Sequence, residues 1–164
     1  MTKSLESFLN KQDVYWFKYD GDCITVATGT FVFMIPDIFP GKYELNVWYK
    51  SSFGRVEESS GEIFDGFLQR DPYSLFEIQR TGITVPVGEA KNKVDVFLVD
   101  NDNILVDSRL LKFADDNVGY AYAAIEVEDS GISPVYLVNG EKVFGLIMPV
   151  NSNTAKYKVV RRDV

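Results

Sequence analysis

The sequence predicts an α+β fold that consists mainly of antiparallel β-sheet with two short helices. Two apolar segments support this prediction: CITVATGTFVFMIP at residues 23–36 and PVYLVNGEKVFGLIMP at residues 134–149. Each segment contains a strand, a turn with glycine, a second strand, and a final proline, which cannot donate a hydrogen bond to a neighbouring strand. Hydrophobic residues make up 46% of the 164-residue chain, which is enough for a packed core. We therefore expect a single domain over residues 1–164.

The first fifty residues predict one helix followed by strands. Leu5, Phe8 and Leu9 fall on one face of a helix in the segment SLESFLNKQ. In the segment YELNVWYK, alternation places Trp48 on the same face as the polar residues around it. The expected elements are a helix at 4–12, a strand ending at the Asp20-Gly21-Asp22 turn, two strands on either side of Gly29, and a strand at 43–50.

The middle of the chain, about residues 51–90, has a different composition. Residues 51–62 are rich in serine, glycine and glutamate and show no clear period, so we expect a mobile loop or a wide hairpin tip. Asp71 as an N-cap, Pro72 at the first helical position and Gly82 as a stop predict a short helix over residues 71–82. The whole middle section is expected to be an insertion or a mobile segment.

The second half resumes the order of the first. Asp107 predicts the start of a helix with Leu110, Leu111 and Ala114 facing inward. The expected elements are strands at 94–99 and 104–106, a helix at 108–114, and further strands up to residue 150. Residues 1–50 and 92–150 are therefore candidate pseudo-repeats of one α-β-β-β unit with a shared core. The alternative interpretation is that any two apolar hairpins look alike.

The composition favours a protein that is not an enzyme. The chain has no histidine, which removes the commonest general base and the usual zinc and iron ligands. Cys23 is the single cysteine and lies in a strand pattern, so we expect a small buried side chain in a reducing cytoplasm. The segment DNDN at 100–103 lacks the glycine and glutamate of a calcium loop. We therefore predict no catalytic residue, no metal, no cofactor and, without a long apolar run, no membrane partner.

Three segments together resemble the domains of DNA sliding clamps, the processivity factors of replicative polymerases. SPVYLVNGEKVFGLIMPV at 133–150 is similar to the end of bacterial-type clamp domains. ILVDSRLLKFADD at 104–116 resembles their helix lead-in, and DGDCITVATGTFVFMIP at 20–36 resembles their first-half hairpin. The resemblance covers about half of the chain. Clamp chains carry several such domains, so a lone domain would have to oligomerise to encircle DNA, or it would have another role.

A clamp-like chain needs cations on the helices that face DNA, because such helices touch phosphates without reading bases. The candidates are Lys3 and Lys11 on the first helix and Arg109 and Lys112 on the second. The alternative is that these four residues are ordinary solvated surface. Candidates for binding a protein partner are Trp16, Trp48, Arg161 and Arg162. Exposed aromatic residues are typical of protein contacts, and the basic tail could equally be a charged edge strand.

Two functional hypotheses follow. The first is a clamp-like module in DNA replication, recombination or repair that works through self-association and protein partners, with DNA as a candidate partner. The second is an acidic phage or mobile-element protein that binds and inhibits a host protein. This second hypothesis depends on the net charge of −7.

Overall fold

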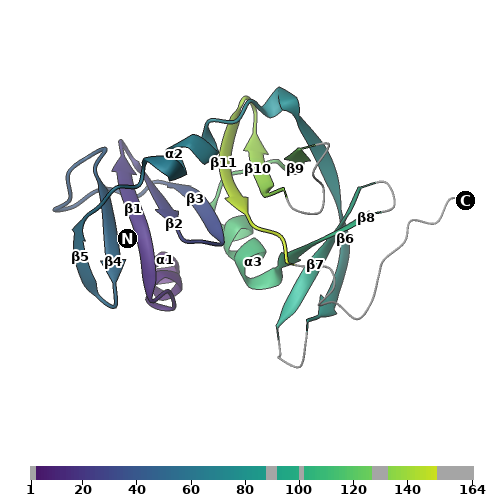
Figure 1. Ribbon diagram of the computed structural model, residues 1–164, viewed down its shortest axis with the longest axis horizontal. Helices are drawn as coiled ribbons and strands as arrows, with labels where there is room; N and C mark the ends of the chain where they lie inside the picture. Colours follow the sequence, from purple (N-terminus) through teal and green to yellow (C-terminus); the bar gives the residue numbers. More distant parts are fainter. Residues whose placement is uncertain (1–2, 88–91, 100–101, 127–132, 151–164) are drawn as a thin grey trace, which may run out of the picture.

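The computed structural model describes residues 3–87, 92–99, 102–126 and 133–150, and within them the chain forms one open antiparallel sheet. The strand order is β5-β4-β1-β2-β3-β11-β10-β9-β6-β7-β8, so β5 and β8 are its two edges (Figure 1). The elements are α1 (Lys3–Asn10), β1 (Val14–Asp20), β2 (Cys23–Ala27), β3 (Phe31–Pro36), β4 (Trp48–Ser52), β5 (Arg55–Glu58), α2 (Glu62–Leu68), a 3-10 turn (Pro72–Ser74), β6 (Leu75–Pro86), β7 (Lys93–Val99), β8 (Asp102–Asp107), α3 (Ser108–Asn117), β9 (Tyr122–Glu126), β10 (Val135–Asn139) and β11 (Lys142–Ile147).

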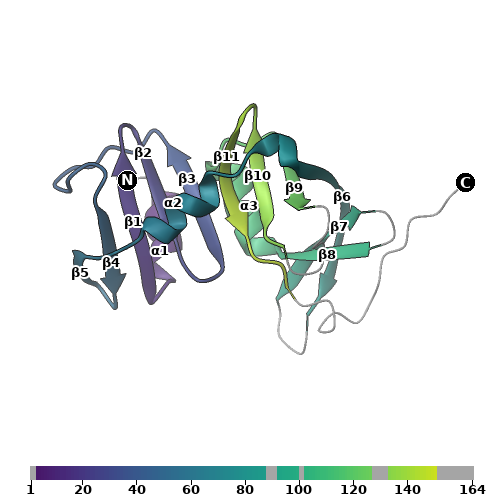
Figure 2. The ribbon, with the colours of Figure 1, turned by 45° about the horizontal axis from the view of Figure 1, so that its top comes forward.

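Helices cover both faces of the sheet. Successive side chains of each strand point to opposite faces, so each strand contributes to two apolar clusters. In β3, Phe31 and Phe33 belong to the core that contains residues of α1 and α3. Val32, between them, belongs to a second cluster, against which Phe64 of α2 packs. Figure 2 shows α2 crossing in front of the strands. The sheet therefore has one face covered by α1 and α3 and another covered by α2.

The centre of the sheet joins strands from the two ends of the chain. β3 pairs with β11 in the register Phe31↔Ile147, Val32↔Leu146 and Phe33↔Gly145. A Cβ atom at residue 145 would lie 2.9 Å from the backbone oxygen of Val32 and 3.1 Å from the Phe33 ring. Glycine at 145 therefore allows the two strands to approach while Phe33 remains fully buried. Phe144 falls at a register shift of the β10–β11 pair and is half-buried.

Several local predictions are confirmed. α1 begins the described chain with Leu5 and Leu9 buried, and Phe8 packs against the same core. Asp107 caps α3, because its carboxylate accepts a hydrogen bond of 2.8 Å from the Arg109 backbone N–H. Leu111 and Ala114 of α3 are buried, as expected, whereas Leu110 is only partly buried. The antiparallel α+β class is thus correct.

The expectation of two helices is wrong, and so is the helix over residues 71–82. The described residues contain three α-helices, and α2 lies in a segment where none was expected. Asp71 does cap a turn, since it accepts from the Tyr73 N–H, but the turn ends at Ser74 and β6 follows. β6 pairs with both β9 and β7, so ladder bonds on two sides outweigh local helix signals. Gly82, with φ of 78°, lies where the β6–β7 register shifts and is not a helix stop.

The alternating strand expected at residues 43–50 is also wrong in its first half. β4 begins only at Trp48. Asn46 has φ of 61° and donates its N–H to the Tyr19 oxygen at 2.7 Å, which interrupts the extended backbone. Tyr43 instead turns back and packs against Phe17 and Tyr19.

The segment at residues 51–62 contains a hairpin. β4 and β5 pair across a turn at Phe53 and Gly54, whose φ angles are 50° and 85°. Two positive φ angles are typical of the two-residue turns that match the twist of a hairpin. All four residues of β5 are exposed, so this strand forms an open edge. The mobility of residues 51–61 remains a prediction.

We predict that Gly145→Ala destabilises the protein by about 1–3 kcal/mol, because the new methyl group must displace the β3 backbone. Urea unfolding followed by circular dichroism measures the change. Gly119→Ala is the matched control, since a Cβ atom there meets nothing within 4 Å. Equal stability of the two variants would contradict the close approach of β3 and β11.

Candidate functional site

The first candidate site is the surface formed by α1 and α3, which we call the two-helix face. The rings of Phe8 from α1 and Phe113 from α3 stack with centroids 3.8 Å apart. This contact and the buried leucines beneath it bring the helices side by side, although 97 residues lie between Asn10 and Ser108 in the chain. A groove of about 600 Å³ lies between them and is lined by polar and apolar residues of both helices and by Thr30 and Phe31.

The structure brings the four predicted cations onto this face. Lys11, Arg109 and Lys112 line the groove, and Lys3 borders an adjoining hollow together with Lys11. All four residues are exposed. The carboxylates that line the two hollows are Glu6, Asp107 and Asp116, so four cations against three anions leave a local charge of +1.

Only one of these cations has a carboxylate partner within ion-pair distance among the described residues. Arg109 lies 3.7 Å from the Asp107 carboxylate, and its side chain is 74% exposed. An exposed pair of this kind contributes little to stability, since water and salt screen it. The charge of Arg109 therefore remains available to an anionic ligand. The two-helix face thus has a small local excess of positive charge, whereas the chain as a whole carries −7.

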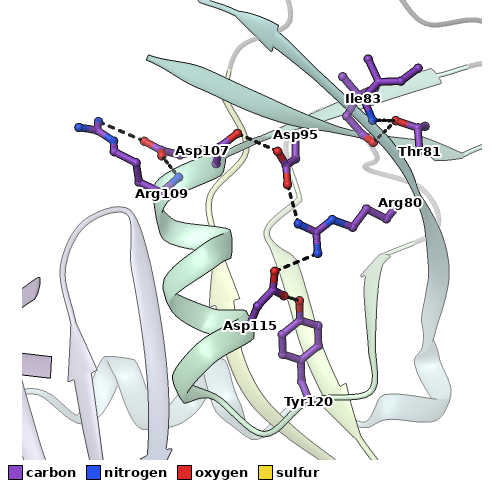
Figure 3. A network of polar contacts seen from close by, with 10 residues as sticks. Arg80, Thr81, Ile83, Asp95, Asp107, Arg109, Asp115 and Tyr120 are labelled. Carbon is purple, nitrogen blue, oxygen red and sulfur yellow. Dashed lines mark hydrogen bonds and ion pairs between the residues drawn. The ribbon is translucent and has the colours of Figure 1, made fainter. Parts of the chain in front are cut away.

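A polar network fixes α3 against the sheet (Figure 3). Arg80 of β6 donates to Asp95 of β7 at 2.7 Å and to Asp115 of α3 at 3.0 Å. Ser108, at the start of α3, donates to the other Asp95 oxygen at 2.8 Å. Tyr120 donates its hydroxyl to Asp115. Both ends of α3 are thus tied to β6 and β7, and this orients Arg109 and Lys112.

The second candidate site lies on the opposite face of the sheet, around Trp16 and Trp48. The expectation that Trp48 is open to a partner is wrong, because this residue is only 5% exposed and lies beneath α2. The Phe64 ring of α2 lies 5.5 Å from both indole rings, measured between centroids. Asp65 of α2 accepts hydrogen bonds from Lys18 Nζ at 2.5 Å and from Trp48 Nε1 at 3.0 Å.

Sequence reasoning missed α2 and therefore missed what covers the tryptophans. A signal was present: Ile63, Phe64, Phe67 and Leu68 recur with the spacing of a helix. Gly66 within this run and the serine-rich stretch before it concealed the pattern. A role for Trp16 and Trp48 in partner binding stays a prediction, while Arg161 and Arg162 lie outside the described residues.

The remaining chemistry of the described residues is limited. No three cysteine, aspartate or glutamate side chains in the described part of the chain gather as metal ligands would. Cys23 is half-buried, and burial and the neighbouring Asp22 raise the pKa of its thiol. In the described ranges no helix has the length and apolar character needed to span a bilayer.

Tyr120 provides a test of the network that holds α3. Burial, followed by its hydrogen bond to Asp115, raises the pKa of Tyr120 above its ordinary value, since both favour the neutral phenol. Unfolded tyrosine loses its proton near pH 10, so the folded state loses stability as the pH rises above about 10. The Tyr120→Phe variant has no phenol to deprotonate, so it does not lose stability in this way as the pH rises. We predict that it is less stable than the parent by about 0.5–1.5 kcal/mol near neutral pH, and that the difference narrows above about pH 10.

Urea unfolding at a series of pH values measures this effect. Tyr73→Phe is the control, because Tyr73 is 79% exposed and its hydroxyl donates its hydrogen bond, of 3.2 Å, to the exposed Glu141 rather than to a group of the network. A stability difference between the parent and Tyr120→Phe that stays constant with pH would contradict the arrangement around Asp115.

Comparisons of this chain with protein-family models, with curated proteins and with solved structures found no match.

Proposed function

We propose that this chain is a non-enzymatic, clamp-like module that acts in DNA replication, recombination or repair through self-association and protein partners. The observation that carries the proposal is the relation between the two ends of the chain. α1 is followed by the meander β1-β2-β3, and α3 by the meander β9-β10-β11. The two meanders meet antiparallel at their last strands, and their helices lie together on one face. This arrangement supports one α-β-β-β unit used twice.

The two-helix face supports DNA as the ligand. Lys3 of α1, Arg109 and Lys112 of α3, and Lys11, one residue beyond the end of α1, are all exposed, as residues that contact a phosphate backbone must be. The described helices offer no aromatic residue at the groove rim that is free to stack on a base, because Phe8 and Phe113 stack on each other. Contacts would therefore position the duplex without reading its sequence.

The two ends of the sheet support self-association. β5 has no neighbour on its outer side among the described strands. Within the described part of the chain, the outer side of β8 carries a single bridge, in which Val150 donates its N–H to the Leu105 oxygen at 2.7 Å. An edge that pairs with a different edge of the next copy gives a heterologous contact, which closes into a ring when the rotation permits. Three of the four β5 residues are charged, which disfavours indiscriminate pairing.

DNA binding by the two-helix face predicts a specific salt dependence. Fluorescence anisotropy of a labelled duplex, measured at increasing salt, gives the slope of log affinity against log salt. Lys11→Ala combined with Lys112→Ala should weaken binding and reduce that slope by about 2, since each phosphate contact contributes about 0.9. Lys42→Ala combined with Lys142→Ala is the matched control, because both lysines are exposed, Lys42 in a turn and Lys142 at the start of β11, neither lines the groove, and the net charge changes equally.

Sedimentation of the parent protein completes the test. A defined closed oligomer together with duplex binding that depends on Lys11 and Lys112 supports the proposal. A monomer that does not bind duplex at low salt would overturn it and would favour the acidic inhibitor suggested by the net charge. Equal loss of binding in both double variants would show that the attraction is not located on the two-helix face.

A further inference from the structure

The face of the sheet opposite the two-helix face carries an apolar surface that the chain covers with its own short helix. Seven residues with at most 3% exposure form this surface, from strands of both ends of the chain, among them Ala27, Val32, Tyr136, Val143 and Leu146. Phe64 and Leu68 of α2 pack on it, and Trp16 joins the same cluster. Trp48 lies next to it, beneath Phe64.

Two adjacent residues of α2, Phe64 and Asp65, make its contacts with the tryptophans. Phe64 packs between the two indole rings, and Asp65 bridges Lys18 of β1 and Trp48 of β4. Gly61 lets the chain pass directly over Trp48, since a Cβ atom there would lie 2.4 Å from the indole. The contact surface thus offers an aromatic slot with a cation beside it, and Lys50 places a second cation 5.0 Å above the Trp16 ring.

α2 itself is a weak helix. It has seven residues, contains Gly66, and has no side-chain hydrogen bond at its N-cap. A helix this short does not form alone in water, so it exists here because it is docked. No α2 residue is fully buried, and Ile63 is 67% exposed. The surface beneath is therefore well formed, while its cover depends on a few contacts.

We propose that α2 is a displaceable internal ligand, and that the surface beneath it binds a helical peptide of a partner protein in which an aromatic residue is followed by an acidic one. Phe64 and Asp65 define this chemistry, because the aromatic ring fills the slot between the tryptophans and the carboxylate meets Lys18. Binding requires α2 to leave, so the apparent affinity is reduced by the small fraction of molecules in which it is undocked. This inference does not depend on DNA binding or on ring formation.

The chain contains a direct reporter, since its two tryptophans are Trp16 and Trp48. The experiment uses the full-length chain and a labelled peptide of residues 61–70 as the probe. Peptide anisotropy gives affinity, and acrylamide quenching of tryptophan fluorescence gives the exposure of the indoles. Asp65→Asn in the chain removes the ionic contact to Lys18 and should raise both quenching and peptide affinity, the latter by about tenfold. Lys18→Gln should also loosen α2, but it should not tighten the peptide, because the peptide needs Lys18.

Ile63→Ala is the matched control within the same helix, because this exposed side chain holds nothing beneath it, and it should change neither measurement. A peptide with Phe64→Ala should not bind to any variant. Circular dichroism establishes that each variant is folded, and Phe64→Ala in the chain is a second way to loosen α2 if Asp65→Asn does not fold. Unchanged quenching and affinity in the loosened variants would overturn the proposal. A loosened variant that forms a dimer without peptide would also overturn it, because α2 would then be exchanged between copies.

Discussion

The pairing of β3 with β11 is the contact on which the rest of the structure depends. It joins residues 31–33 to residues 145–147 and makes one sheet from two meanders that lie far apart in the chain. Gly145 permits the close approach, and the fully buried Phe33 fills the space above it. Without this pair each meander would keep an open edge and an apolar face exposed to water. With it, α1 and α3 share one face and α2 spans the other.

The two faces differ in how their helices are held, and this difference bears on function. α3 is fixed at both ends by Arg80, Asp95 and Asp115, so the cations of the two-helix face are displayed on a rigid support. α2 is held by the packing of Phe64 and Leu68 and by the Asp65 contacts, and it has no fully buried residue. A charged surface for a uniform polymer benefits from rigidity, because its contacts are then preorganised. A surface for a peptide can instead use a cover that leaves at modest cost.

Local signals predicted those elements whose boundaries are set by neighbouring residues. Asp107 begins α3 through its own carboxylate, and the turn at Asp20-Gly21-Asp22 closes the β1–β2 hairpin. The same kind of signal failed at Asp71, which caps one turn before the chain becomes β6. β6 lies inside the sheet and pairs on both sides, so distant strands decided its conformation. At Asn46 the backbone N–H likewise donates to the oxygen of the distant Tyr19, so the strand expected from residue 43 begins only at Trp48.

The sequence by itself determined the antiparallel α+β class, the cap of α3 and the β1–β2 hairpin, the lack of histidine, and the helical positions of Lys3, Arg109 and Lys112, whereas Lys11 lies one residue beyond α1. These depend on residue identity and short-range geometry. The tertiary structure alone decided that the helices lie side by side, because the Phe8–Phe113 contact crosses more than a hundred residues. It also decided that Trp48, which alternation places among polar neighbours, is covered by α2. Alternation fixes the face to which a side chain points, but packing between distant segments decides what lies over that face.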